Sequence, residues 1–213
     1  MTALRYTGKT LLWILTISVA LVSWRFFVGG VAETMNIVAH NIPDREIALF
    51  AHIGFAPLAL LLMPFQFWKG LRMRRPKIHR WIGRIYVLAI LISGVGGLFI
   101  AFYTTAGTFA AIGFGLLAVL WIATTLIGLW HIRARRIVDH QRWMIRSAAL
   151  TFAAVTLRLW LPLGTFGLGF PFDTFYPYVA WLCWVPNLII AEVWLRKLER
   201  AKRFELSTFT LAR

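Results

Sequence analysis

The sequence contains little charge and very few acidic residues, and this scarcity is the first indication of its class. Only 15% of the 213 residues are charged, whereas 60% are hydrophobic. A soluble domain of this length would expose far more apolar surface than one core could cover. The composition therefore excludes an ordinary soluble domain and predicts an integral membrane protein.

Cysteine is almost absent, and so are the short motifs of the common enzyme classes. The single cysteine, Cys183, lies in an apolar stretch, which excludes a disulfide framework and predicts a buried structural thiol. The sequence has no glycine-rich phosphate loop, nucleophile elbow or dinucleotide-binding fingerprint. It therefore offers no catalytic motif, and whether the protein is an enzyme stays open.

Six runs of largely apolar residues are each long enough to cross a bilayer. A helix of about 20 residues spans a hydrocarbon core of about 30 Å. Because the connections between the runs are short, we expect one all-α membrane domain over residues 1–213, polytopic, with about six transmembrane helices. The runs cover residues 9–30, 46–68, 81–103, 109–130, 143–163 and 174–194.

Basic residues are concentrated on alternate connections between these runs. The chain has 23 lysines and arginines against 8 acidic residues, and most of the basic ones follow the second, fourth and sixth runs. The positive-inside rule therefore predicts cytoplasmic termini, with residues 196–213 as a basic cytoplasmic tail. Because the charge lies between membrane spans, we expect it to attract anionic lipid and do not expect a nucleic-acid partner.

An internal duplication relates two of the basic connections. The pattern R-x-R-R-x-x-x-H occurs at residues 72–79 and again at 133–140, and each copy is followed by R-W-x-x-R. Each copy crosses the membrane inward, turns and returns, so residues 46–103 and 109–163 are predicted to be parallel hairpin repeats. We expect spans two to five to form an antiparallel four-helix core in which equivalent helices lie diagonally.

The duplication places a histidine, His79 or His140, at the same position of each copy. Two imidazoles on diagonal helices are the ligand set of a six-coordinate b-type haem, and Arg80 and Arg142 could hold its propionates. The alternative is that each H-R-W unit only anchors its helix, with tryptophan among the lipid head groups and arginine reaching phosphate. Both readings stay open at this point.

His52 and Arg158 are ionisable residues inside the apolar runs, at similar depths. Helical rise places His52 about 9 Å below the outer surface, and Arg158 lies about five residues from the outer end of the fifth span. Ionisable groups within a bilayer indicate a functional site, here for a quinone head group or another small polar ligand. Alternatively, Arg158 extends outward and His52 binds a neighbouring carbonyl.

Two further polar sets have simpler readings. His131 and Asp139 could complete a zinc site with the paired histidines, but their spacing does not match a known zinc motif. Glu192 lies four residues before Arg196, which predicts an ion pair along one helix.

The stretch from His52 to Leu163 resembles a known family. The residues that carry the resemblance are K-I-H-R-W-I-G-R-I-Y at 77–86 and R-W-M-I-R-S-A-A-L-T-F-A-A-V-T-L-R-L at 142–159. They are similar to the bacterial predicted membrane proteins grouped as domain of unknown function 2306. The resemblance covers a little over half of the chain, and it implies a multi-pass protein of the bacterial inner (plasma) membrane with no established activity.

A weaker similarity is to the two-haem transmembrane b-type cytochromes, which have a duplicated four-helix core with histidine ligands on diagonal helices. This similarity implies a haem b between His79 and His140, whereas His52 lacks a symmetric partner for a second haem. The leading hypothesis is therefore a redox protein for electron transfer, with haem iron bound by His79 and His140 and a quinone near His52 and Arg158. The competing hypothesis is a non-enzymatic carrier of a small ligand or lipid, or an accessory subunit of an oligomer or larger assembly.

Overall fold

The computed structural model describes residues 2–211, together with the side chains of residues 7, 8 and 10–201. The predicted tail at residues 196–213 therefore lies partly outside the described residues. Within that range the elements are α1 (Thr2–Ser23), α2 (Phe26–Thr34), α3 (Asn36–Ala39), α4 (Glu46–Phe67), α5 (Lys69–Arg74), α6 (Pro76–Ala101), α7 (Gly107–Arg133), α8 (Ile137–Thr151), α9 (Ala153–Pro162), the π-helical turn η1 (Leu163–Gly167), α10 (Phe172–Leu182) and α11 (Val185–Leu211).

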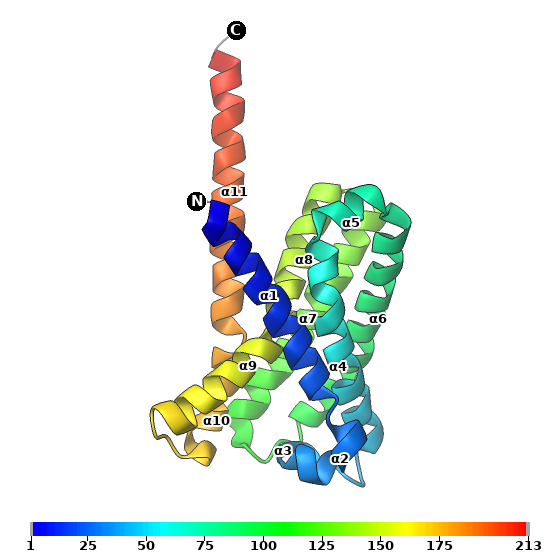
Figure 1. Ribbon diagram of the computed structural model, residues 1–213, viewed down its shortest axis with the longest axis vertical. Helices are drawn as coiled ribbons and strands as arrows, with labels where there is room; N and C mark the ends of the chain where they lie inside the picture. The colour runs from blue at the N-terminus through cyan, green and yellow to red at the C-terminus, as the bar shows by residue number, and fades with distance from the viewer. Residues whose placement is uncertain (1, 212–213) are drawn as a thin grey trace.

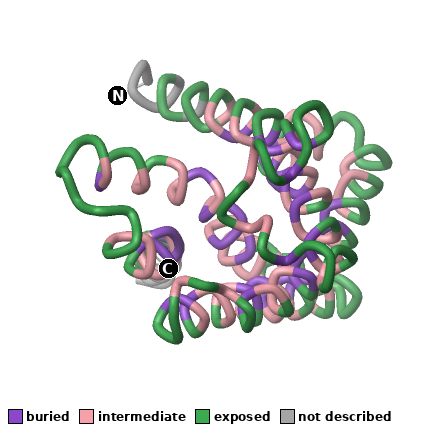
Figure 2. Tube along the Cα trace, turned by 90° about the horizontal axis from the view of Figure 1, so that it is seen from below, coloured by how far each residue is buried: buried purple, intermediate pink, exposed green. Residues whose placement is uncertain are grey.

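The helices are long and apolar enough to confirm a membrane protein of about six spans. In the described part of the chain, five helical segments meet the length and hydropathy needed to cross a bilayer, and the bent pair α1–α2 makes a sixth. Large apolar side chains such as Leu88, Val95 and Val119 are exposed on the outside of the helices, where they contact lipid. Figure 2 shows that the buried residues lie mainly where the helices face one another.

The predicted four-helix core is present, and equivalent helices lie diagonally in it. Helix α4 packs on α6, α6 on α7 and α7 on α8, and a smaller contact between α8 and α4 closes the ring. As a result α4 lies opposite α7, and α6 lies opposite α8 (Figure 1). Outside this core, α1 packs on α4, α10 on α7 and α9, and α11 on α8.

The two basic segments of the repeat adopt the same local geometry, which supports the duplication. The Arg84 guanidinium lies 4.9 Å from the ring centroid of Trp81, and that of Arg146 lies 4.7 Å from the ring centroid of Trp143. In both copies the arginine follows the tryptophan by three residues on a helix, which places the two side chains on one face. The start of α1 and the end of α11 lie toward the same end of the molecule as α5 (Figure 1); we refer to this as the basic end.

The first predicted span is broken rather than continuous. A bend of 76° separates α1 from α2, at Trp24 and Arg25. Trp24 Nε1–H donates to the Gly54 carbonyl of α4 at 2.9 Å, and Arg25 Nε–H donates to the Thr34 carbonyl at the end of α2 at 2.9 Å. These bonds fold the chain back, so α2 and α3 lie across the end of the bundle opposite the basic end (Figure 1).

The fifth span is also interrupted, at Phe152, which separates α8 from α9. Helix α9 and η1 turn away from the core helices, with α10 beside α9 (Figure 1). The fifth predicted span, residues 143–163, is therefore present within the span Ile137–Gly167, but it is made of more than one helical segment. The divergence matters for function, because α9 carries Arg158 and forms one wall of the cavity described below.

Glu192 of α11 pairs with Arg146 of α8 rather than along its own helix. Arg146 Nη2 donates to Glu192 Oε2 at 3.0 Å, and Nε donates to Oε1. The bidentate geometry is the stronger arrangement, because both carboxylate oxygens are held by one planar guanidinium. The hydrogen-bonded partner predicted for Glu192, Arg196, is therefore corrected to Arg146, and the pair ties the last helix to the core.

Candidate functional site

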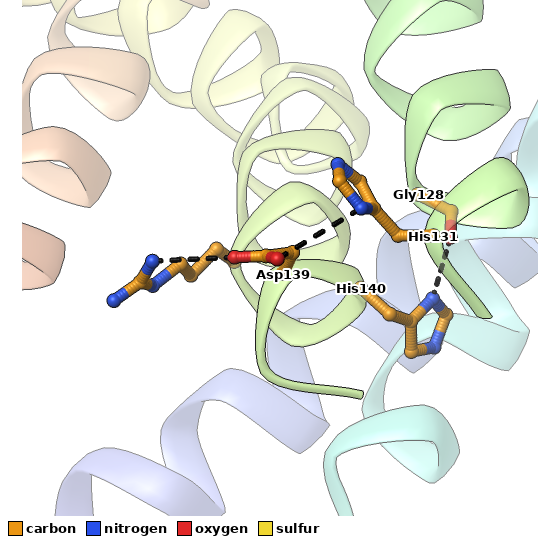
Figure 3. A network of polar contacts seen from close by, with 5 residues as sticks. Gly128, His131, Asp139 and His140 are labelled. Atoms are coloured by element: carbon orange, nitrogen blue, oxygen red, sulfur yellow. Dashed lines mark hydrogen bonds and ion pairs between the residues drawn. The ribbon is translucent and has the colours of Figure 1, made fainter. Parts of the chain in front are cut away.

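The predicted histidine pair lies at the basic end, near the turn between α7 and α8. His79 and His140 are close enough to interact electrostatically. His140 Nδ1–H donates to the Gly128 carbonyl at 2.8 Å (Figure 3), which leaves its Nε2 free of partners among the described residues. His79 Nδ1 is buried without a hydrogen-bond partner in the same range. The duplication thus places the two imidazoles within electrostatic range of one another at the basic end.

The two arginines that accompany this pair differ in their contacts. Arg142 Nη1 donates to Asp139 Oδ1 at 3.3 Å, and its Nη2 lies 3.1 Å from Glu199 Oε1. Arg80 is exposed. Two carboxylates already balance the charge of Arg142, so Arg80 is the less engaged of the two predicted propionate partners.

The alternative zinc site has no support in the geometry. His131 Nδ1 and Asp139 Oδ2 are 4.0 Å apart, which is too long for a hydrogen bond (Figure 3). Throughout the described side chains, no three histidine, cysteine or acidic residues gather as metal ligands. These residues shape the α7–α8 turn instead.

His52 and Arg158 are brought together in the half of the bundle away from the basic end. His52 Nδ1–H donates to the Ser93 carbonyl of α6 at 2.9 Å. Arg158 Nη1 donates to the Ala154 carbonyl of its own helix, and Nη2 donates to Ser23 Oγ of α1, both at 2.8 Å. The two side chains are within electrostatic range of one another and line the same cavity. The carbonyl contact expected for His52 is present, and it leaves Nε2 available.

Glycines of α6 allow His52 to reach Ser93. A Cβ atom on Gly97 would lie 2.6 Å from His52 Nδ1, and one on Gly96 would lie 2.5 Å from the Ala48 carbonyl oxygen. Larger residues would push α4 and α6 apart, because these distances are far below van der Waals contact. The small residues of α6 therefore position one of the two polar groups of the site.

The cavity has a volume of about 900 Å³ and lies between the core helices, α9 and α10. Its mouth, beside α3 and the α6–α7 turn, is lined by polar residues that include Asn36 and Thr105. Its deep end is formed mainly by apolar side chains, among them Leu60, Trp121 and Leu150. A volume of this size accommodates an organic molecule of drug-like dimensions. His52 and Arg158 are also among its lining residues.

A closed network of hydroxyl groups lies beneath the deep end and was not predicted. Tyr86 Oη lies 2.9 Å from Thr151 Oγ1, which also accepts from Trp121 Nε1–H at 2.8 Å. Ser147 Oγ and Thr125 Oγ1 are 2.8 Å apart. All five side chains are buried and join α6, α7 and α8. Single hydroxyls in apolar runs carry no pattern, so only the packing identifies the set.

Comparison with known proteins places the chain in a family. The sequence model of the family described as predicted membrane protein DUF2306 matches residues 49–195. No curated protein and no solved structure matches the chain. The matched segment runs from α4 into α11 and includes both repeats, the histidine pair, His52 and Arg158. The chain therefore belongs to the DUF2306 family of predicted membrane proteins.

Proposed function

We propose that this protein binds an amphipathic small molecule in the cavity lined by His52 and Arg158, and that it acts as a carrier or an accessory membrane subunit. The observation that supports this function is a cavity of about 900 Å³ whose wall is largely apolar but carries the ionisable side chains of His52 and Arg158 within the spans. Such groups inside a membrane span are costly unless they serve a ligand or a partner. Quinones and lipids are the chemical classes that combine a polar head with an apolar body, as this cavity requires.

The arrangement assigns a role to each group. His52 Nε2 and the unused N–H groups of Arg158 offer hydrogen bonds to a polar head, and the deep end of the cavity accepts the apolar part. We place the basic end in the cytoplasm of a bacterial inner membrane, in agreement with the positive-inside rule. The cavity mouth then opens toward the outer side, where a ligand would enter.

Filling the cavity is expected to displace its ligand. Ala118 lies on the cavity wall in α7, and Ala118→Phe places a ring in the space. Val119, the next residue, is exposed to lipid, so Val119→Phe adds a ring outside the bundle. We expect a bound small molecule to accompany the wild type and Val119→Phe, and its amount to fall at least about fivefold in Ala118→Phe, a loss of about 1 kcal/mol in binding. The measurement is mass spectrometry of protein extracted in polymer-bounded native nanodiscs.

Equal ligand content in the two variants would contradict binding in this cavity. Wild-type protein without any enriched small molecule would also contradict the proposal. Because both variants introduce phenylalanine at adjacent positions of one helix, Val119→Phe controls for the effect of an added ring on expression and extraction.

A second candidate function is electron transfer through one haem b at His79 and His140. The observation that favours it is the bond from His140 Nδ1–H to the Gly128 carbonyl, since haem-ligating histidines commonly hold Nδ1 in this way and offer Nε2 to iron. Arg80 is the side chain free to hold a propionate, and the haem would supply one-electron chemistry. The quinone class at His52 and Arg158 would then be its redox partner.

The haem hypothesis predicts a Soret band and a reduced-minus-oxidised difference spectrum in protein purified from haem-supplemented cells. Loss of an axial ligand removes a six-coordinate haem or converts its spectrum, so His79→Ala and His140→Ala should each abolish the low-spin signal. His131→Ala is the matched control, because His131 lies at the same end of the bundle outside the pair, and it should keep the spectrum. Colourless wild-type protein would leave the ligand-binding proposal as the sole function.

A further inference from the structure

Arg158 carries a positive charge that no acidic side chain within the described residues neutralises. Its two hydrogen bonds go to the Ala154 carbonyl and to Ser23 Oγ, which are both neutral. Among the described side chains, the ion pairs involve Arg142, Arg146 and His131, and none involves Arg158. An unpaired charge at this depth is expensive, because the surrounding lipid and apolar side chains solvate it poorly.

A second cation lies near the first. Arg25 lines the same cavity and is within electrostatic range of Arg158. Its hydrogen bonds also go to neutral groups, the carbonyls of Thr34 and Val22. The acidic residue on the cavity wall is Asp173, which is exposed at the start of α10 and forms no ion pair with either arginine. The part of the cavity around Arg158 is therefore electropositive.

The free donors of Arg158 match a particular kind of acceptor. A guanidinium has five N–H donors in one plane, and Arg158 uses two of them, at 2.8 Å each, to bond the Ala154 carbonyl and Ser23 Oγ. The remaining donors favour paired oxygens, because a carboxylate or a phosphate accepts two parallel N–H bonds from one guanidinium. A neutral carbonyl would accept a hydrogen bond but would leave the charge unbalanced.

The wall beyond Arg158 accepts an apolar chain and offers no second polar site. Thr151 at the end of α8 and Arg158 on α9 stand on either side of the break at Phe152, and both line this part of the cavity. Leu60, Leu117 and Leu150 are among its lining residues. At its floor, Thr151 and Trp121 are bonded to each other, so their polar groups are already satisfied. The ligand therefore needs a polar group at one end alone.

The side of the cavity also suits a molecule that arrives from lipid. A smaller, almost wholly apolar cavity of about 380 Å³ shares Leu161 and Phe172 with the large one. It is bordered by Phe166, which is 90% exposed on η1. The two cavities adjoin at Leu161 and Phe172, so apolar surface continues from the large cavity toward the exposed Phe166.

We infer that the ligand of this cavity is a single-chain amphiphile with an anionic head, a carboxylate or a phosphate monoester. The head binds Arg158, and the chain extends toward Trp121. This inference rests on the proposed binding in the cavity and adds the charge of the head group and the form of the tail. A neutral quinone in the same cavity would satisfy the proposed function and contradict the inference.

The test is calorimetric titration of the detergent-solubilised full chain with four probes that share one alkyl chain. The probes are decanoate, decyl phosphate, decanol and decyltrimethylammonium, titrated below their micelle-forming concentrations at mildly alkaline pH, where the carboxylic acid is ionised. We expect the wild type to bind decanoate or decyl phosphate at least about tenfold more tightly than decanol. The better of the two anions identifies the head group as carboxylate or phosphate, and the cation should not compete.

Substitutions of Arg158 test whether this residue causes the preference for anionic probes over decanol. Arg158→Gln keeps amide donors and removes the charge, so it should lower the affinity for the anion at least about tenfold and leave decanol unchanged. Arg158→Lys keeps the charge and loses the paired donors, so its anion affinity should fall between those of the wild type and Arg158→Gln. Arg45→Gln is the control, since Arg45 lies over the Tyr103 ring outside the cavity lining. Its anion affinity should equal that of the wild type.

Two results would overturn the inference and separate it from the proposed function. If decanol and the anions bind the wild type equally, or if Arg158→Gln binds the anion as tightly as the wild type, the head group is not anionic and the cavity stays a binding site for a neutral molecule. If no probe binds, and if Ala118→Phe changes no bound molecule, both statements fail. The comparison of probes on the wild type needs no variant, so it holds even if Arg158→Gln does not fold.

Discussion

Replacing Gly96 by alanine is expected to destabilise the bundle by about 2–3 kcal/mol, the upper part of the range for overpacking. The new Cβ would lie 2.5 Å from the Ala48 carbonyl oxygen and 3.1 Å from both Ala51 Cβ and His52 N. Backbone atoms cannot move aside as a side chain can, so α4 and α6 must separate along their contact. Unfolding in mixed micelles of increasing denaturing detergent measures the change.

Gly54→Ala is the matched control for this prediction. Gly54 lies in α4, and a Cβ there would meet no atom within 4 Å. A glycine in the interior of a helix costs about 0.5–1 kcal/mol relative to alanine, so Gly54→Ala should leave stability unchanged or raise it. If both variants unfold at the same detergent concentration, the close approach of α4 and α6 at Gly96 does not limit the packing.

The diagonal core could be predicted from the sequence because the repeat shows which residues of the two hairpins are equivalent and in which direction each hairpin crosses the membrane. A copy of R-x-R-R-x-x-x-H with the same flanking tryptophan specifies which residues are equivalent, and short connections leave few ways to arrange two hairpins. His79 and His140 are brought close for this reason. His52 and Arg158, which the sequence placed at similar positions along their spans, line one cavity.

The breaks in the first and fifth spans could not be obtained in the same way. Hydropathy reports whether a segment prefers lipid, and both segments do so on either side of the bend. The bend at Arg25 depends on a carbonyl of α2 and on a contact from Trp24 to α4, which are tertiary interactions. The cavity is bounded by α9, which turns outward from the core. The hydropathy of a single span does not predict that turn, so it did not predict the cavity either.

Pairing between helices was the least predictable part of the site. Glu192 has Arg196 one turn away, and local spacing favours that pair, but Arg146 is presented by a neighbouring helix with better geometry. The same holds for Tyr86 and Thr151, whose hydroxyls meet across two helices. Periodicity shows which face of a helix is buried, and it does not show which residue lies opposite.

Replacing Thr151 by valine is expected to destabilise the protein by about 2 kcal/mol, because it leaves a buried donor without an acceptor. Thr151 donates its proton to the Ser147 carbonyl at 2.9 Å, so its two lone pairs accept from Trp121 Nε1–H and from Tyr86 O–H. In the variant Tyr86 can turn to Ser147 Oγ, 3.3 Å away, whereas Trp121 has no such alternative. The loss is therefore larger than the roughly 0.6 kcal/mol of an average hydrogen bond between membrane helices.

Thr16→Val separates this network effect from the cost of losing any buried hydroxyl. Thr16 is fully buried in α1, but its hydroxyl bonds only the carbonyls of Leu12 and Trp13 in its own helix, and it accepts no proton from a neighbour. The substitution has the same shape and should cost less than about 0.5 kcal/mol, since those carbonyls keep their helical partners. Equal losses in Thr16→Val and Thr151→Val, measured by unfolding in mixed micelles, would show that the hydroxyl network adds nothing beyond local bonding. A larger loss of stability in Thr151→Val means that hydrogen bonds hold α6, α7 and α8 in register beneath the cavity floor. Apolar packing in lipid does not specify that register alone.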